Sequence, residues 1–295
     1  MKNIIVITGG AGFVGANLIS FLLKNTKYKI LSIDNYSSGL KINHIKNKKV
    51  KYIKGNTKNI STLLNSKKNK INAIFHFGEF SRIYQSFLKM GECIDSNTVG
   101  SHAVFNFCLN NKIKLIYSAT SASLGNKGRD KDLSPYAFTK SINLELLENL
   151  KKWFKMKYEI IYFYNVYGPR QISIGNMATV IGIFENAYKN KKPLPIVKPG
   201  TQSRKFTHIS DTVKVCYDAW KKNKCRHYSV SSKKDYSILE VAKLFGPKIK
   251  LLPARSGERY ASALTNMNLS NKVYKNFGKI SLKTYIEKFK NAHKR

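Results

Sequence analysis

Three glycines near the N-terminus have the spacing of a loop that binds a dinucleotide. Gly9, Gly12 and Gly15 follow the apolar run NIIVIT and open a segment with helical spacing, Phe13–Lys24. Gly9 permits a tight turn, Gly12 lets a pyrophosphate approach the backbone, and Gly15 permits close packing of the helix on the strand. Since the positive end of the helix dipole faces the same place, we expect a pyrophosphate to bind there.

An acidic residue at the end of the second apolar run indicates which dinucleotide binds. Asp34 follows the run Lys29–Ile33. Its carboxylate would accept hydrogen bonds from a ribose diol and repel a 2′-phosphate, which favours NAD over NADP. Lys41 lies close enough in the sequence to weaken this preference, and so NADP stays open.

A tyrosine and a lysine one helical turn apart form a second group of residues with chemistry. Tyr136 and Lys140 are spaced i and i+4 and therefore share a helix face. A phenol, with its pKa of about 10, is a poor base at neutral pH, but a nearby ammonium and a cationic nicotinamide ring would lower that pKa. Thr120 ends a strand at the edge where open α/β sheets bind ligands. The three residues predict proton removal from a substrate hydroxyl.

Short apolar runs that alternate with helical segments must position these residues. The alternation predicts an α/β fold with a doubly wound parallel sheet of Rossmann type. Among the helical segments, Arg82–Asn110 is the longest, and Pro135 is placed to begin another that runs to Lys155. The predicted strands are Asn3–Thr8, Lys29–Ile33, Val50–Ile53, Ile71–Phe77, Ile113–Tyr117 and Glu159–Phe163.

The pattern changes after Gly168, where prolines and glycines become frequent and the elements become shorter. We expect an NAD-binding domain over residues 1–168, to which some later segments return. A smaller C-terminal α/β substrate-binding lobe mainly occupies residues 169–295. The Lys-rich segment Lys283–Arg295 predicts a final amphipathic helix.

The composition is that of a folded protein with a large positive charge. The 295 residues include 53 Lys and Arg against 16 Asp and Glu, a net charge of +37, and 42% are hydrophobic. The hydrophobic share excludes a disordered chain, and no apolar run is long enough for a transmembrane segment. Basic clusters are short and scattered, which disfavours nucleic acid as the main partner.

The cysteines and histidines give no sign of a metal site. No metal-ligand spacing occurs among the histidines or among the scattered cysteines, so we predict no metal. Reduced thiols of this kind favour a cytoplasmic protein, and the N-terminal run leads into glycines instead of a signal-peptide cleavage site. The cysteines are Cys93, Cys108, Cys216 and Cys225.

Ordered blocks along nearly the whole chain resemble the extended short-chain dehydrogenase/reductases that act on nucleotide sugars. The similarity is greatest to NAD-dependent epimerases of the UDP-glucose 4-epimerase type. The blocks are TGGAGFVG at Thr8, SIDNYSSG at Ser32, FHFGEFSRIYQS at Phe75, DSNTVGS at Asp95, SPYAFTK at Ser134, YFYNVYGPR at Tyr162, PGTQSRKFTHISD at Pro199 and PARSGER at Pro253.

The resemblance implies a role for each matched position. It makes Thr120, Tyr136 and Lys140 the catalytic residues, with NAD as cofactor and a nucleotide-diphosphate sugar as substrate. The implied NAD-binding residues are Gly9, Gly12, Phe13, Val14, Gly15, Asp34, Asn35, Asn56, Thr57, Phe77, Gly78, Glu79, Asn97, Ser118, Tyr136, Lys140 and Tyr164. The implied substrate-binding residues are Thr120, Asn165, Asn176, Arg204 and Arg255.

The resemblance also implies a homodimer, formed through the helices in Arg82–Asn110 and Pro135–Lys155. Several positions depart from the family pattern. The interval between Thr120 and Tyr136 is short, which trims the loop that often covers the sugar. Glu79 and Arg82 bring two charges near the sugar site, either as a local ion pair or as substrate contacts.

The residues after Thr120 distinguish among related reactions. Related 4,6-dehydratases carry Asp-Glu there, whereas this chain carries Ser121, Ala122 and Ser123. Without a carboxylate the elimination of water lacks its proton donor, so we expect an epimerase that oxidises a sugar hydroxyl, at C4, and reduces the ketone from the other face. The alternatives are an ADP-heptose 6-epimerase, another nucleotide-sugar dehydratase or reductase, and a non-catalytic NAD-binding scaffold for RNA or anionic membrane.

Overall fold

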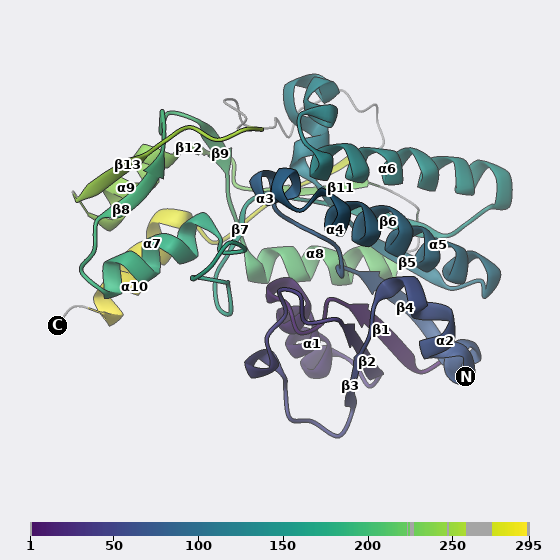
Figure 1. The fold of residues 1–295 in the computed structure, drawn as a ribbon. Helices are drawn as coiled ribbons and strands as arrows, with labels where there is room; N and C mark the ends of the chain where they lie inside the picture. The colour runs from purple at the N-terminus through teal and green to yellow at the C-terminus, as the bar shows by residue number, and fades with distance from the viewer. Residues whose placement is uncertain (1, 223, 225–226, 247, 258–272, 294–295) are drawn as a thin grey trace.

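The larger part of the molecule is a parallel sheet with helices on both faces (Figure 1). The structure, a computed structural model, describes residues 2–222, 224, 227–246, 248–257 and 273–293. Among these, eight strands form the sheet in the order β14-β11-β6-β5-β4-β1-β2-β3. The strands are β1 Ile4–Thr8, β2 Lys29–Asp34, β3 Val50–Lys54, β4 Ile71–His76, β5 Lys114–Thr120, β6 Tyr158–Phe163, β11 His227–Ser231 and β14 Val273–Phe277.

The sheet is buried on both faces because its apolar side chains alternate between two cores. Ile4 and Val6 face one core, and Ile5 and Ile7 face the other. The first core is completed by α2 (Ile60–Leu64), α5 (Ser101–Asn110) and α6 (Pro135–Phe154). The second is completed by α1 (Phe13–Asn25) and α8 (Ile209–Lys222). This arrangement confirms the predicted doubly wound α/β fold.

One expected helix is divided in the structure. The segment Arg82–Asn110 forms α3 (Ile83–Leu88), α4 (Met90–Ile94), a π-helical segment (Asp95–Gly100) and α5. The expectation of one long helix is therefore wrong. The wider π turn places Asn97 inward, where its amide accepts from the Phe80 N–H at 2.6 Å and donates to the Phe80 carbonyl at 3.0 Å. Asn97 thus lies where the helix widens, and its side chain holds the loop after β4.

The smaller lobe is built from short strand pairs covered by three helices. Its core includes Phe184, Ile196, Phe245 and Ile286. The lobe lies beside the carboxyl edge of the sheet, and the C-terminus lies at its far end (Figure 1). Its strand pairs are β7 (Val166–Tyr167) with β10 (Thr207–His208), β8 (Leu194–Val197) with β13 (Ile249–Leu252), and β9 (Ser203–Lys205) with β12 (Asp235–Ser237). Its helices are α7 (Val180–Lys189), α9 (Ile238–Phe245) and α10 (Leu282–Ala292).

Segments late in the chain complete the large sheet. Both β11 and β14 come after strands β7 to β10 of the lobe in sequence, yet they extend the sheet beyond β6. The predicted final helix, Lys283–Arg295, corresponds to α10, and its last two residues lie outside the described part of the chain. Among the described helices, none combines the length and the apolar composition that a membrane crossing requires.

Candidate active site

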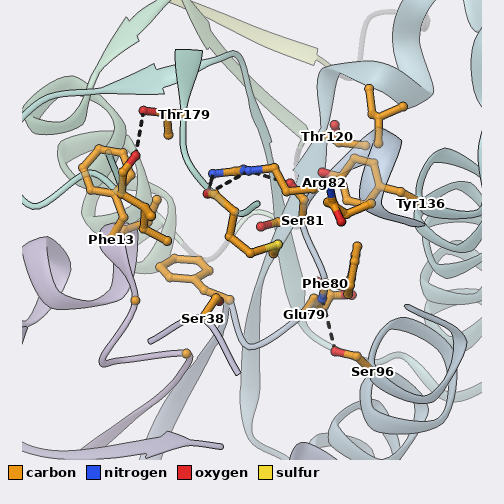
Figure 2. A pocket seen from close by; sticks show the side chains of 18 of the residues that line it. Phe13, Ser38, Glu79, Phe80, Ser81, Arg82, Ser96, Thr120, Tyr136 and Thr179 are labelled. Atoms are coloured by element: carbon orange, nitrogen blue, oxygen red, sulfur yellow. Dashed lines mark hydrogen bonds between the residues drawn. The ribbon is translucent and has the colours of Figure 1, made fainter. Parts of the chain in front are cut away.

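A cleft of about 880 Å³ lies where the carboxyl edge of the sheet meets the smaller lobe (Figure 2). Both parts of the chain line it, as expected for a ligand site at the switch point of an open α/β sheet. The predicted site residues that line it are Gly9, Gly12, Phe13, Val14, Gly15, Asp34, Asn35, Asn56, Thr57, Phe77, Gly78, Glu79, Ser118, Thr120, Tyr136, Lys140, Asn165, Asn176, Arg204 and Arg255.

The loop between β1 and α1 has the form that a pyrophosphate needs. Gly9 has a φ of +71°, and a Cβ on Gly15 would lie 2.2 Å from the carbonyl oxygen of Gly9, so neither position accepts another residue without strain. Gly12 caps α1 without a side-chain hydrogen bond. The first N–H groups of the helix therefore have no side-chain oxygen as partner, and an anion at this end would be stabilised by them.

Asp34 is fixed at the end of β2 by backbone donors. Its carboxylate accepts from the N–H of Ala11 at 2.9 Å and from the N–H of Tyr36 at 2.8 Å. Burial raises the pKa of Asp34, and these hydrogen bonds act in the opposite direction. Next to it, Asn35 donates to the side-chain oxygen of Asn56 at 2.8 Å. The glycine loop and this carboxylate together fit the pyrophosphate and adenosine ribose of NAD.

Thr120, Tyr136 and Lys140 line the same part of this cleft. Thr120 ends β5, and Ser134 caps α6 by accepting from the N–H of Ala137 at 3.1 Å, which fixes the first turn that carries Tyr136. Burial raises the pKa of Tyr136 to about 12, while a hydrogen bond with Thr120 and the charge of Arg82 lower it. In Figure 2 the side chains of Thr120 and Tyr136 lie next to each other. The pair can bind a substrate hydroxyl.

Glu79 is paired with Lys140, an arrangement that the sequence did not predict. The Lys140 ammonium donates to the Glu79 carboxylate and to the carbonyl oxygen of Ser118. The two side chains are only 4% and 2% exposed. Burial lowers the pKa of Lys140, and the negative charge of Glu79 raises it. The buried pair thus keeps the ammonium charged in a site that would otherwise disfavour it.

Arg82 has a different partner from the one considered in the sequence. Its Nε donates to the carbonyl oxygen of Met177 at 3.0 Å, and its Nη2 donates to the same oxygen at 2.5 Å. The Glu79–Arg82 ion pair is replaced by the Glu79–Lys140 pair. Figure 2 shows Arg82 crossing the cleft, with Tyr136 and Thr120 on one side and Phe13 and Thr179 on the other. Arg82 therefore ties the loop after β4 to the segment before α7.

The predicted substrate residues other than Thr120 come from the segments after β6. Asn165 donates to the carbonyl oxygen of Lys205 at 2.9 Å. Arg204 lies on β9 and is 9% exposed. Arg255 is exposed, and its guanidinium carbon lies 5.2 Å from the ring centre of Tyr84. Guanidinium groups bind phosphate in two-point fashion, so two of them suit a nucleotide diphosphate. Asn176 lines the same region and is exposed. Glu258 and Arg259, the end of the block PARSGER, lie outside the described residues.

Two predicted cofactor residues are not brought to the cleft. Asn97 is fully buried behind it and hydrogen-bonds the backbone of Phe80. Tyr164 is 1% exposed, and its hydroxyl accepts from Ser229 at 3.2 Å inside the core. Both residues support the wall of the site instead of lining it. The described residues contain no cluster of metal-ligating side chains.

Residues 5–238 match the NAD dependent epimerase/dehydratase family. The chain belongs to this family, whose members use NAD as cofactor.

Individual relatives carry out different reactions within the family. An ADP-L-glycero-D-manno-heptose-6-epimerase of Brachyspira hyodysenteriae is 31% identical over 225 residues, which cover 72% of this chain and 70% of the relative. A dTDP-D-glucose 4,6-dehydratase of Dictyostelium discoideum is 28% identical over 266 residues, 81% of this chain. The match spans 60% of the length of that relative.

The fold is also that of a known crystal structure. The UDP-glucose 4-epimerase of Thermotoga maritima, solved with UDP-glucose, has a TM-score of 0.85 with 21% identity and covers 99% of this chain and 100% of its own. This likeness agrees with the predicted Rossmann-type fold.

Proposed function

We propose that this chain is an NAD-dependent epimerase of a nucleotide-diphosphate sugar, with UDP-glucose or UDP-N-acetylglucosamine as substrate and C4 as the reacting carbon. The main observation in support is that Thr120, Tyr136 and Lys140 line the same cleft as the glycine loop. Arg204 and Arg255 also line this cleft. A sugar bound through its diphosphate would thus meet a base beside the cofactor.

The carboxylates of the cleft support epimerisation over elimination. Among the described lining residues there are four, and each has partners other than a substrate: Asp34 with backbone N–H groups, Glu79 with Lys140, Glu92 with Lys89 and Asp95 with Lys58. The residues that follow Thr120 are Ser121 and Ala122. Elimination of water from a keto sugar needs a proton donor at the leaving hydroxyl, and this cleft offers none from those four groups.

The catalytic residues would divide the proton chemistry among them. Tyr136, as phenolate, takes the proton from the sugar hydroxyl, and Thr120 orients that hydroxyl and then donates to the ketone oxygen. Lys140 has three N–H donors, of which Glu79 and Ser118 take two. The third would be available to hold the nicotinamide ribose. When bound, NAD supplies the hydride acceptor for the oxidation and the hydride donor for the reduction.

The direct test is turnover of defined nucleotide sugars. Purified protein is incubated separately with UDP-glucose, UDP-N-acetylglucosamine and ADP-heptose, and products are followed by NMR. We expect a 4-epimer from a UDP-sugar, and a Tyr136→Phe variant that keeps its NAD but loses at least a thousandfold in kcat. A dehydrated product, or full activity without the Tyr136 hydroxyl, would overturn the proposal.

The second candidate is 6-epimerisation of an ADP-heptose. The Brachyspira relative, at 31% identity, favours it. The same experiment separates the two candidates, because only the ADP-heptose arm would then give a product.

We also propose that the enzyme is a homodimer. Exposed apolar side chains gather on α3, α4 and α6, which lie side by side in Figure 1. They include Leu88, 64% exposed, Met90, 55%, and Phe138, 53%. A two-fold axis along these helices would bury the same side chains on both copies.

The cytoplasm is the compartment that we propose for this reaction. Cys93, Cys108 and Cys216 are free and buried, and Cys225 lies outside the described residues. Reduced thiols of this kind are typical of cytoplasmic proteins.

A further inference from the structure

A buried carboxylate beside the catalytic lysine has more partners than an ion pair requires. The Oε1 atom of Glu79 accepts from Ser101 Oγ at 2.7 Å, from the Tyr117 hydroxyl at 3.0 Å and from Asn143 Nδ2 at 3.3 Å. Its other oxygen accepts from Lys140. Four donors thus converge on this one buried carboxylate and fix its position.

The hydrogen bonds behind Glu79 have a defined direction. Thr8 Oγ1 accepts from the N–H groups of Phe77 and Gly78 at 3.1 and 3.0 Å, so its own hydrogen goes to His76 Nδ1, 2.7 Å away. His76 then carries its hydrogen on Nε2 and donates to Ser101 Oγ at 2.9 Å. The hydroxyl of Ser101 is left to donate to Glu79. Every donor in this chain points toward the carboxylate.

The chain from Thr8 to Glu79 begins at the end of β1 and reaches the catalytic helix. Thr8 directly precedes Gly9, and Lys140 lies on α6. The Lys140 ammonium also lies 4.7 Å from the ring centre of Tyr117, whose hydroxyl is one of the donors to Glu79. The position of the ammonium is therefore set by groups on β1, β4, β5 and α5, by Glu79 in the loop after β4, and by Asn143 on its own helix.

We propose that Glu79 is a positioning residue that fixes Lys140 through the chain Thr8–His76–Ser101 and keeps a negative charge beside the base Tyr136. The inference rests on the proposed epimerase function and deepens it. Because Glu79 offsets the charge of Lys140, the phenolate of Tyr136 depends more on Arg82 and on Thr120. The acid limb of the pH–activity profile therefore lies at a higher pH than it would if Lys140 had no carboxylate partner.

The charges around Tyr136 support this shift of the reaction to higher pH. Burial has the largest effect and raises the pKa of Tyr136; among the groups around it, Thr120 and Arg82 lower that pKa, and Glu79 and Cys93 raise it. His76 faces Glu79 from β4, and burial lowers the pKa of that imidazole to about 4, so it is neutral in the working range. Removal of the Glu79 charge therefore eases ionisation of Tyr136, and the neutral ring of His76 does not offset that change.

The first test is the pH profile of Glu79→Gln, measured as kcat/KM on the UDP-sugar that the wild type accepts. The substitution keeps the shape of the side chain and removes its charge. We expect the acid limb to move down by about one pH unit, because Tyr136 ionises more easily. Glu287→Gln, which removes a carboxylate paired with Lys283 on exposed α10, is the matched control and should leave the profile unchanged. A Glu79→Gln profile that is lower at every pH but unshifted would overturn the proposal.

The second test does not depend on turnover. A buried ammonium exchanges slowly with water and gives its own ¹H–¹⁵N signal, which is assigned to Lys140 by its loss in Lys140→Met. We expect Glu79→Gln to abolish this signal and Ser101→Ala to broaden it, because Ser101→Ala keeps the carboxylate but breaks the chain from His76. A signal unchanged in Glu79→Gln would refute the positioning role. If no nucleotide sugar reacts while the signal behaves as expected, the epimerase function fails and the Glu79–Lys140 arrangement stands.

Discussion

The buried imidazole of His76 links the end of β1 to the start of α5 behind the site. His76 ends β4, is fully buried, and hydrogen-bonds Thr8 on one side and Ser101 on the other. Since neither ring nitrogen reaches water, burial lowers its pKa, and the neutral ring is a condition of the native structure.

His76 should make the protein less stable in mild acid. Its pKa falls from 6.5 to about 4 on folding, so between these values the unfolded chain binds more protons and the free energy of unfolding decreases as pH falls. We expect a loss of about 2 kcal/mol between pH 7 and pH 5 from this group. Urea unfolding at both pH values measures it.

The control for this effect is His76→Gln, which keeps hydrogen-bonding groups but does not titrate. All other titrating groups are common to both proteins, so the difference between the two pH dependences isolates His76. Equal slopes in the variant and the wild type would contradict the assignment.

Residue types and spacing could predict the parts of the site that are local in sequence. Gly9, Asp34 and Tyr136 each follow a strand or begin a helix, and their roles depend on that place alone. The Glu79–Lys140 pair joins residues 61 positions apart, and no local pattern gives such a partner. Tyr164 belongs to a matched block, but its side chain turns into the core, which the block does not reveal.

At the scale of elements, the β1–α1 turn is fixed by backbone hydrogen bonds. The N–H of Gly9 donates to the carbonyl of Ile33 on β2 at 2.8 Å, and the N–H of Gly12 donates back to Gly9 at 3.1 Å. The turn is therefore held to the neighbouring strand at the place where the helix begins.

Gly15→Ala should remove NAD binding. The new methyl group would lie 2.2 Å from the carbonyl oxygen of Gly9, so α1 must shift away from β1 and the loop loses its shape. We expect at least a hundredfold weaker NAD binding by calorimetry. Gly91→Ala, where a Cβ meets nothing within 4 Å, is the control and should bind NAD normally. Normal binding by both variants would show that this contact does not shape the site.

The outer face of α6 allows a test of the dimer. Phe138 and Ile142 are one turn apart on that helix and are 53% and 39% exposed. Phe138→Glu should convert a dimer into a monomer, measured by light scattering, because it places a charge on the apolar face. Leu251→Glu, a similarly exposed position on the lobe, should leave the mass unchanged. A wild type that is monomeric would refute the proposed assembly.

The strands of the first half could be predicted because each contains apolar residues, and five of the six are buried in the sheet, whereas the edge strand β3 is only half-buried. All six expected runs correspond to strands of the sheet, with ends that differ by a few residues. The helix over Arg82–Asn110 could not be predicted correctly, since the chain leaves helical geometry at Lys89 and widens to a π-helical segment where Asn97 reaches Phe80. That contact is tertiary, and helical spacing alone continues through it.

At the scale of the whole molecule, the net charge of +37 would favour the approach of the anionic substrate proposed above. A positive surface attracts nucleotide diphosphates toward the cleft, whose lining includes Arg204 and Arg255. This field is screened by salt.

The apparent KM for a UDP-sugar should therefore rise with ionic strength. Between about 0.05 M and about 0.5 M NaCl the Debye length falls severalfold, and we expect KM to rise at least threefold with little change in kcat. Steady-state kinetics at constant pH measures this. A KM independent of salt would show that the net charge does not contribute to substrate capture.

The strand order has a consequence for any attempt to divide the molecule. In the intact protein, β6 lies between β5 and β11, and β11 is followed by β14. A fragment that stops at residue 168 lacks both later strands, so the N–H and C=O groups along Tyr158–Phe163 become an open, apolar edge. Such an edge recruits other chains. Isolated residues 1–168 should therefore precipitate, although they contain the entire glycine loop.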